Sequence, residues 1–292
     1  MKYYLAPVAA CLVLTACGGS SSSSDGGSDR ETSTTAKTVA IDFKAVADGQ
    51  DIACGTTYVV GTADTDVNVT DFRFYVHNVR LVTDSGTEVT VTLDQNDWQN
   101  GDIAMLDFRD KDTDCSGDAK DVNTAITGTV PDDSLTYTGV RFTIGVPEDR
   151  NHLLNADQPS PMNAPNMFWA WTSGYKFMKL DVTPVGGTVW SFHLGSGGCT
   201  GNPATGETAE CLRINRPEIA LDGFDVDTDT IQFDYGNLVA NSNVSQNLGG
   251  APGCMSGNTD PECPEVFTAL GLNLDSGEND PNLVQTVFSI AP

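Results

Sequence analysis

The chain has 292 residues and a formal net charge of −25, with 40 acidic against 15 basic side chains. Because no basic cluster interrupts this acidity, nucleic acid and anionic membrane surfaces are excluded as partners of the folded part. Only 8% of the residues are aromatic, so a dense aromatic run marks either the centre of the core or a binding site.

The first 17 residues have the pattern of a bacterial lipoprotein signal. Lys2 precedes an apolar run that reaches Leu14, and small residues then lead to Cys17. The run is too short to be a membrane-spanning helix of the mature chain. We expect lipidation of Cys17 and, because Gly18 follows it, an anchor in the outer membrane that faces the periplasm or the cell surface. An ordinary secretory signal is the alternative.

Residues 18–37 predict a flexible tether behind the anchor. They are mostly Gly, Ser, Asp and Thr and include an unbroken serine run, so they offer no apolar face to a core. Residues 38–292 contain no second linker, which predicts a single domain.

Alternation of polar and apolar residues with period two predicts strands along most of this domain. The predicted strands cover residues 38–46, 57–60, 72–83, 88–93, 103–108, 135–146, 175–182, 188–194, 210–215, 219–222 and 230–238. Helical signal is confined to residues 119–126 and, after Pro264, to the segment 260–273. This pattern predicts an all-β fold, an antiparallel β-sandwich or barrel-like domain with long loops and little helix.

Six cysteines remain beyond the signal, and export to an oxidising compartment predicts that they form disulfides. They are Cys54, Cys115, Cys199, Cys211, Cys254 and Cys263. Among the fifteen possible pairings, the easiest loops to close join Cys199 with Cys211 and Cys254 with Cys263, which leaves Cys54 with Cys115. A thiolate metal site is the alternative, and the absence of any C-x-x-C pair disfavours it.

The densest aromatic run, residues 166–181, holds Trp169 and Trp171 one residue apart. His152 precedes this run on an expected loop, and His193 follows it on an expected strand. From the residues alone, His193 is either a structural histidine or a metal ligand, whereas a surface loop explains His152 and a half-exposed sheet position explains His77.

No catalytic motif accompanies these histidines. Residues 110–121 imitate a calcium loop, but Cys115 stands where the turn requires glycine and no glutamate closes the loop. The sequence also contains no nucleophile elbow, no zinc-protease helix motif and no phosphate-binding glycine loop. We therefore expect a protein that is not an enzyme.

Five segments of the chain form a recognisable set: FRFYVHNVRLV (72–82), LDFRDKDTDC (106–115), NHLLNAD (151–157), MFWAWTSGYKFMKLD (167–181) and FHLGSGGC (192–199). Together they resemble the MbnP family of periplasmic copper proteins, the four-cysteine partner of a metallo-mystery pair, which is similar in part to MopE and CorA. The resemblance spans residues 38–240. It is most specific in the W-x-W and H-L-G-S-x-G-C segments.

The resemblance implies a copper site made in two stages. A partner, a diheme oxidase of the cytochrome c peroxidase/MauG type (MbnH-type), would convert Trp169 to kynurenine, and the product would help two histidines bind one Cu(I). Carried over by position, these are His152 and His193, with His77 in reserve. The implied role is copper homeostasis. The resemblance also implies a set of four family cysteines, Cys54, Cys115, Cys199 and Cys211, with Cys254 and Cys263 as an additional pair.

The chemistry of these side chains agrees with the implied site. An indole offers a metal no lone pair, because its only nitrogen is a hydrogen-bond donor. Kynurenine has an aromatic amine and a ketone, and neutral imidazoles beside such a weak donor suit the lower oxidation state of copper. The alternative is a β-sandwich module that binds a carbohydrate or protein ligand on an aromatic platform of Trp169, Trp171 and Trp190. A third option is an enzyme that uses the acidic loops.

Overall fold

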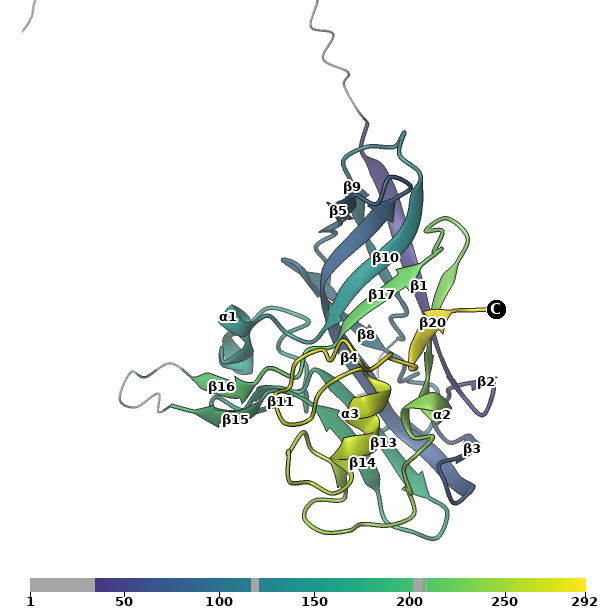
Figure 1. Cartoon of the computed structure of the whole chain (residues 1–292), viewed down its shortest axis with the longest axis vertical. Coiled ribbons are helices and arrows are strands. Elements are labelled where there is room, and N and C mark those ends of the chain that lie inside the picture. The colour runs from purple at the N-terminus through teal and green to yellow at the C-terminus, as the bar shows by residue number, and fades with distance from the viewer. Residues whose placement is uncertain (1–34, 117–120, 202–206, 208) are drawn as a thin grey trace, which may run out of the picture. The chain divides into compact units, whose positions relative to one another are not determined.

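The computed structural model describes residues 35–116, 121–201, 207 and 209–292 (Figure 1). The predicted signal 1–17, the predicted lipidation site Cys17 and residues 18–34 of the predicted tether lie outside this range. The first strand, β1 (Lys37–Ala47), begins where the predicted tether ends. Within the described residues, no helix is long and apolar enough to cross a membrane.

Two large β-sheets confirm the all-β prediction. The first has the order β20 (Phe288–Ile290), β18 (Thr230–Asp234), β1, β9 (Ala125–Val130) and β6 (Thr92–Leu93), with β2 (Gln50–Asp51) paired to β1. The second has the order β17 (Glu218–Asp222), β10 (Tyr137–Ile144), β4 (Thr65–Thr83), β13 (Met178–Pro184), β14 (Trp190–Leu194) and β19 (Gly253–Cys254). Strands β3 (Thr57–Val60), β5 (Glu88–Thr90) and β8 (Ile103–Asp107) also pair with β4, and β7 (Gln99–Asn100) pairs with β8.

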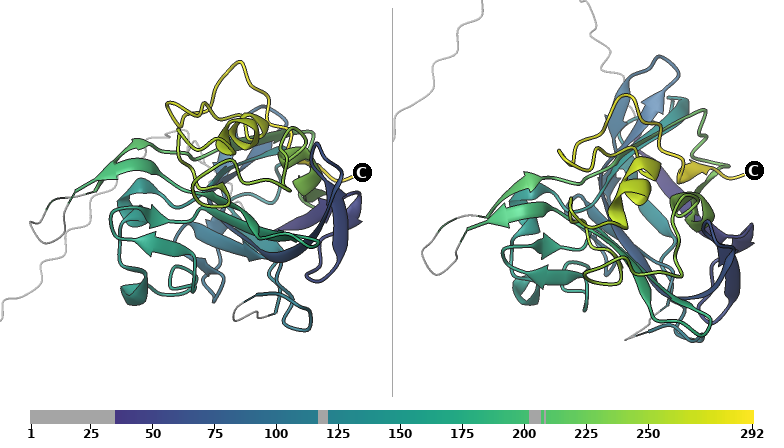
Figure 2. Two further views of the ribbon diagram at one scale, coloured as in Figure 1. Left: turned by 90° about the horizontal axis from the view of Figure 1, so that it is seen from below. Right: turned by 60° about the horizontal axis from the view of Figure 1, so that its bottom comes forward.

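Two small hairpins complete the strands. One joins β11 (Phe168–Ala170) to β12 (Gly174–Tyr175), and the other joins β15 (Gly197–Thr200) to β16 (Glu210–Arg213). The β15–β16 hairpin extends away from the large sheets (Figure 2). The helices are short: α1 (Glu148–Asn151), η1 (Asn155–Asp157), α2 (Tyr235–Leu238) and α3 (Cys263–Ala269).

The core lies between the two large sheets, as expected for a sandwich. Phe233 on β18 packs against Phe72 on β4 with ring centroids 4.4 Å apart, and Phe43 on β1 packs against Phe142 on β10 at 5.6 Å. Buried side chains occur at every second position of β1, from Val39 to Ala47, and of β18. These alternate side chains face the core. Burial of the aromatic rings is therefore the main force that joins the sheets.

Four local predictions are wrong. The predicted strands 88–93 and 175–182 are each divided between two sheets, the first into β5 and β6 and the second into β12 and β13. The predicted helix at 119–126 is absent from its described part, because residues 121–124 are not helical and Ala125 begins β9. Pairing of Ile126 with Ile41 buries both side chains, so packing overrides the weak helical signal. The predicted strand 230–238 ends at Asp234, whose carboxylate accepts a hydrogen bond from the amide of Asn237 and caps α2. The predicted helix after Pro264 corresponds to α3.

All three predicted disulfides are confirmed. Cys54 is bonded to Cys115, Cys199 to Cys211 and Cys254 to Cys263. The second bond joins facing residues of β15 and β16, and the third joins β19 to α3. Because each sulfur is bonded to another sulfur, the alternative of a thiolate metal site is wrong.

The core predicts a large effect of aromatic truncation. Replacement of Phe233 by Ala removes a fully buried ring between the sheets and should lower the free energy of unfolding by about 3–5 kcal/mol. Replacement of Val284, which is 82% exposed, by Ala should change it by less than about 0.5 kcal/mol. Urea denaturation of both variants measures the difference, and equal effects would contradict the assigned core.

Candidate metal centre

The β11–β12 hairpin places Trp169 beside strand β14, which carries His193. The ring centroids of Trp169 and His193 are 6.4 Å apart, and the indole is only partly buried. The contact depends on Gly195, because a Cβ atom at this position would overlap Cζ3 of Trp169. The tryptophan predicted to be modified therefore lies next to an imidazole and not deep in the interior.

His193 is held by a carboxylate on the neighbouring strand. Its Nε2 lies 2.8 Å from Oδ1 of Asp181 on β13, so Nε2–H donates to the carboxylate and Nδ1 keeps its lone pair. Burial lowers the pKa of His193 below 6.5, although Asp181 opposes the shift. A neutral imidazole whose second nitrogen is fixed by a carboxylate is a common arrangement for a metal ligand.

The predicted alternation around His193 is present, but both faces are covered. Trp190 and Phe192 face the core, and His193 is itself only 8% exposed. Trp190 is 2% exposed, so the proposed aromatic platform of Trp169, Trp171 and Trp190 is wrong. A ring inside the core is not available for stacking with a sugar.

Asp181 belongs to a cluster of charged side chains on one face of the sheet. Its members lie at alternate positions near three adjacent strands: Asp71 and Arg73 on β4, Asp107 and Arg109 at the end of β8, and Lys179 and Asp181 on β13. Lys179 contacts both Asp71 and Asp181, while Asp71 binds Arg73 at 2.7 Å. Burial acts to raise the pKa of Asp181, but hydrogen bonds and charges from His193 and Lys179 outweigh it and hold that pKa well below 3.8.

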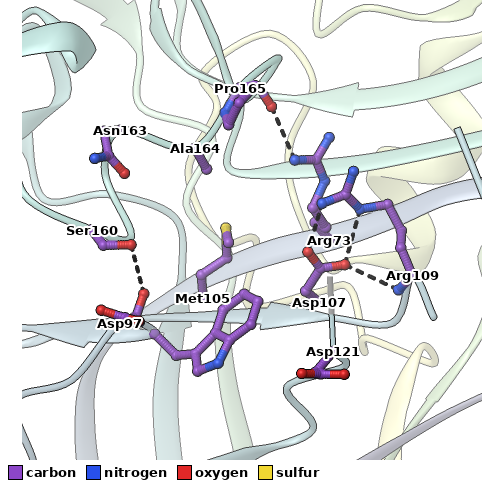
Figure 3. Close-up of a pocket in the computed structure, with 11 residues that line it drawn as sticks. Arg73, Asp97, Met105, Asp107, Arg109, Asp121, Ser160, Asn163, Ala164 and Pro165 are labelled. Atoms are coloured by element: carbon purple, nitrogen blue, oxygen red, sulfur yellow. Dashed lines mark hydrogen bonds and ion pairs between the residues drawn. The ribbon is translucent and has the colours of Figure 1, made fainter. Parts of the chain in front are cut away.

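The far side of the charge cluster borders a cavity of about 440 Å³ (Figure 3). Arg73 donates to the carbonyl oxygen of Pro165 at 3.0 Å, and Arg109 binds Asp107 at 2.7 Å. These contacts satisfy the charged groups within the protein, which assigns them a structural role. The sequence analysis missed the cluster, although the spacings D-x-R (71–73), D-x-R (107–109) and K-x-D (179–181), within or at the ends of predicted strands, were a usable signal.

His152 stands at the C-terminal end of α1 with its ring oriented by the backbone. Its Nδ1 lies 2.8 Å from the carbonyl oxygen of Trp171, so Nδ1–H donates and Nε2 keeps the lone pair. The side-chain amide of Asn151 lies 3.0 Å from this Nε2 and 3.3 Å from Oγ of Ser196. Sequence analysis placed His152 on a surface loop, whereas its side chain is 11% exposed.

Two sulfur atoms also lie near His152. The sulfurs of Cys199 and Cys211 and a ring nitrogen of His152 all lie within 4.8 Å of one another, and Nε2 is 3.4 Å from Sγ of Cys211. Because these sulfurs form a disulfide, they offer no thiolate. The contact instead fixes the β15–β16 hairpin against the histidine.

A second cavity, of about 520 Å³, opens beside Trp169. Its lining residues are Trp169, Ser173, Ser196, Gly197, Gly198, Arg213, Ala251, Met255, Ser256 and Gly257. Neither histidine lines this cavity. His193 packs against Trp169, which does line it, and His152 is linked through the amide of Asn151 to Ser196, another lining residue. His193 therefore lies next to Trp169, whereas His152 is linked to the cavity only through the side chains of Asn151 and Ser196.

His77, the reserve ligand, lies on β4 between Thr143 and Ile103. Burial, followed by the charge of Arg216, lowers its pKa to about 4. Its Nε2 is buried without a hydrogen-bond partner among the described residues. The charged groups that shift the pKa of His77 do not belong to the β11–β12 hairpin that carries Trp169. His77 therefore stays a reserve ligand.

Comparisons with known proteins give matches to one family. A model of the family described as MbnP matches residues 36–256, a range that includes Trp169, His152 and His193. MbnP from Methylosinus trichosporium has a similar structure, with a TM-score of 0.79, 34% sequence identity, and coverage of 88% of this chain and 98% of that chain. No curated protein matches the chain.

The low pKa of Asp181 predicts an acid-dependent loss of stability. Because the folded-state pKa lies below the value of the unfolded chain, Asp181 stabilises the fold above about pH 4, and this contribution is lost as the pH falls further. Asp181→Asn should therefore be less stable than the parent at pH 7, and the difference should shrink below pH 4. Urea denaturation across this range measures it, with Asp222→Asn, at an exposed carboxylate, as the control. A constant difference would contradict the assigned ion pairs.

Proposed function

Because the chain belongs to the MbnP family, we propose that it is a copper-binding protein of the cell envelope whose Cu(I) site is completed by oxidation of Trp169. A diheme oxidase of the cytochrome c peroxidase class would carry out this oxidation, so the protein is a substrate and not an enzyme. The predicted lipid anchor at Cys17 would hold it at the outer membrane. Its role would be in copper homeostasis.

The contact between Trp169 and His193 is the observation that supports this proposal most directly. The ring centroids are 6.4 Å apart, and Asp181 binds Nε2 of His193, which leaves Nδ1 as the nitrogen able to bind a metal. Neutral nitrogen ligands suit copper, and the low pKa of His193 keeps its imidazole unprotonated at neutral pH.

His152 fits the role of the second imidazole. The carbonyl oxygen of Trp171 accepts its Nδ1–H, so Nε2 carries the lone pair. The amide of Asn151 occupies that lone pair at 3.0 Å. Metal binding by His152 therefore requires the Asn151 side chain to give up this hydrogen bond.

The oxidation of Trp169 can be written as a balanced reaction. The bond between C2 and C3 of the indole breaks, and two molecules of hydrogen peroxide supply one oxygen atom to each carbon while they are reduced to water. Hydrolysis then removes the formyl group as formate and leaves an aromatic amine and a ketone. The residue exchanges one carbon atom for one oxygen atom and gains donors that the indole lacked.

Production of the protein together with its diheme oxidase tests the modification. The peptide that contains Trp169 should show the mass change of one carbon replaced by one oxygen, and the same protein should bind one copper per chain. Trp169→Phe should abolish both, whereas Trp171→Phe should retain the modification. Unmodified Trp169 after exposure to active oxidase and peroxide would contradict the proposal.

Substitution of the histidines tests the ligand set. In the modified protein, His193→Gln and His152→Gln should each lower Cu(I) affinity by more than about 100-fold, because loss of a supporting group alone costs about 10–100-fold. Asp181→Asn, which removes the partner of His193 Nε2, should cost about 10–100-fold. Competition with a Cu(I) chelator measures these losses. His77→Gln serves as the control, and a large loss in that variant would reassign the ligand.

A further inference from the structure

We propose that a cavity at the start of β14 binds a neutral, hydroxyl-rich ligand of the size of one sugar ring. Its lining includes Trp190, residues of the loop 241–248 and residues of the segment 261–265. The cavity has a volume of about 270 Å³, just below the usual range of about 300–1,000 Å³ for ligand sites. It shares no lining residue with the cavity beside Trp169, so it is a separate site.

Three side chains that line this cavity each have a buried polar atom without a hydrogen-bond partner among the described residues. The atoms are Nε1 of Trp190, Oγ of Ser242 and Oε2 of Glu262. These residues are 2%, 8% and 7% exposed, respectively. Buried polar groups are normally paired, so three unpaired groups around one cavity point to a ligand that supplies their partners.

The unpaired atoms ask the ligand for both a hydrogen-bond acceptor and a donor. The indole N–H of Trp190 can only donate, the carboxylate oxygen of Glu262 can only accept, and the hydroxyl of Ser242 can do either. A hydroxyl group on the ligand also does both, so one hydroxyl-rich molecule can pair all three atoms. A metal cation would leave the indole N–H unpaired.

The charges of the cavity favour a neutral ligand. Glu262 and Glu265 are the charged residues in its described lining, and no Lys or Arg accompanies them there. Carboxylates and phosphates are therefore repelled. The side-chain amides of Asn241, Asn243 and Gln246 also line the cavity, and each amide can donate to and accept from ligand hydroxyls.

The loop that carries Ser242 is fixed to the turn after β3. The amide of Thr62 donates to the carbonyl oxygen of Ser242 at 2.9 Å. Gly61 has a φ of 73°, and a Cβ atom there would lie 2.6 Å from the same oxygen. Only glycine combines this conformation with so close an approach. The position of Ser242 is therefore set by the fold.

The position of Glu262 is fixed as well. Its Oε1 accepts a hydrogen bond from the amide of Leu248, which leaves Oε2 for a ligand. The next residue, Cys263, is bonded to Cys254 on β19. Both walls of the cavity are thus held in place by the protein itself, as expected for a preformed ligand site.

The site would use the edge of the Trp190 ring and not its face. The ring is too buried for a sugar to stack on it, but its N–H lacks a partner. Glu262 and Glu265 lie beyond residue 256, where the match to the family model ends. The site therefore does not follow from the family match.

NMR of the indole N–H groups tests the proposal. The chain has four tryptophans, and the signal that disappears in Trp190→Phe is that of Trp190. Glucose, galactose and mannose are titrated separately, and at least one of them should shift the Trp190 signal in a saturable way. The signal of Trp98, which lines another cavity, should stay unchanged. Sorbitol, an open-chain polyol, and Ca²⁺ should not shift the Trp190 signal.

Two variants that retain Trp190 give a second readout. For the sugar that binds, Ser242→Ala should weaken affinity about 2–10-fold and Glu262→Gln about tenfold or more, because the second bond involves a charged group. Glu262→Gln keeps an oxygen for the amide of Leu248 but replaces the unpaired acceptor. Glu278→Gln, at an exposed carboxylate, is the matched control and should bind as the parent does. Circular dichroism checks that each variant is folded.

Three results would overturn the site: a Trp190 signal that none of the three sugars shifts, a shift produced by sorbitol or Ca²⁺ alone, or unchanged affinity in both folded variants. The titrations use protein with unmodified Trp169 and no copper. Failure of this inference therefore leaves the proposed copper function untouched, and failure of the copper function leaves this inference untouched.

Discussion

The buried pairing of three carboxylates with three cations determines where His193 lies. Charges are costly to bury unless they are paired, and removal of one partner leaves another charge unpaired in the interior. Asp71, Lys179 and Asp181 form one continuous set of contacts across β4 and β13, and Asp181 ends it by binding His193. A register slip of one residue would move these charges to the phenylalanine side of the sheet, so the ion pairs also fix the alignment of the strands.

Strands β4 and β13 are therefore buried on both faces, one against the apolar sandwich core and the other against a polar interior. On β4, Phe72 and Phe74 face the sandwich core, while Asp71 and Arg73 face the opposite side, where Arg73 also binds the backbone at Pro165. An exposed second face would be the usual arrangement for an antiparallel sheet. Here the loops and the β11–β12 hairpin cover it, and a polar interior with a candidate metal centre results.

Sequence patterns predicted the parts of this arrangement that depend on near neighbours. Period two predicted β1, β3 and β17 closely, and short loops predicted the disulfides of Cys199 and Cys254. The spacing D-x-R at Asp71, which the sequence analysis did not use, places two charges on one face of a strand. It does not show that Lys179, more than a hundred residues away, lies between Asp71 and Asp181. Contacts between distant strands depend on register, which no local pattern contains.

The W-x-W spacing has a structural explanation in the β11–β12 hairpin. The side chain of Trp169 contacts His193 on the sheet, while the backbone carbonyl of Trp171 binds the Nδ1–H of His152 beside α1. One short hairpin therefore touches both imidazoles, the first through the Trp169 ring and the second through the carbonyl oxygen and the ring of Trp171. Because the second contact is made by Trp171, it does not depend on the state of the Trp169 ring. Oxidation of Trp169 could then create a metal donor at a place where the orientation of both histidines is already set, which is the condition for a site that binds copper only after modification.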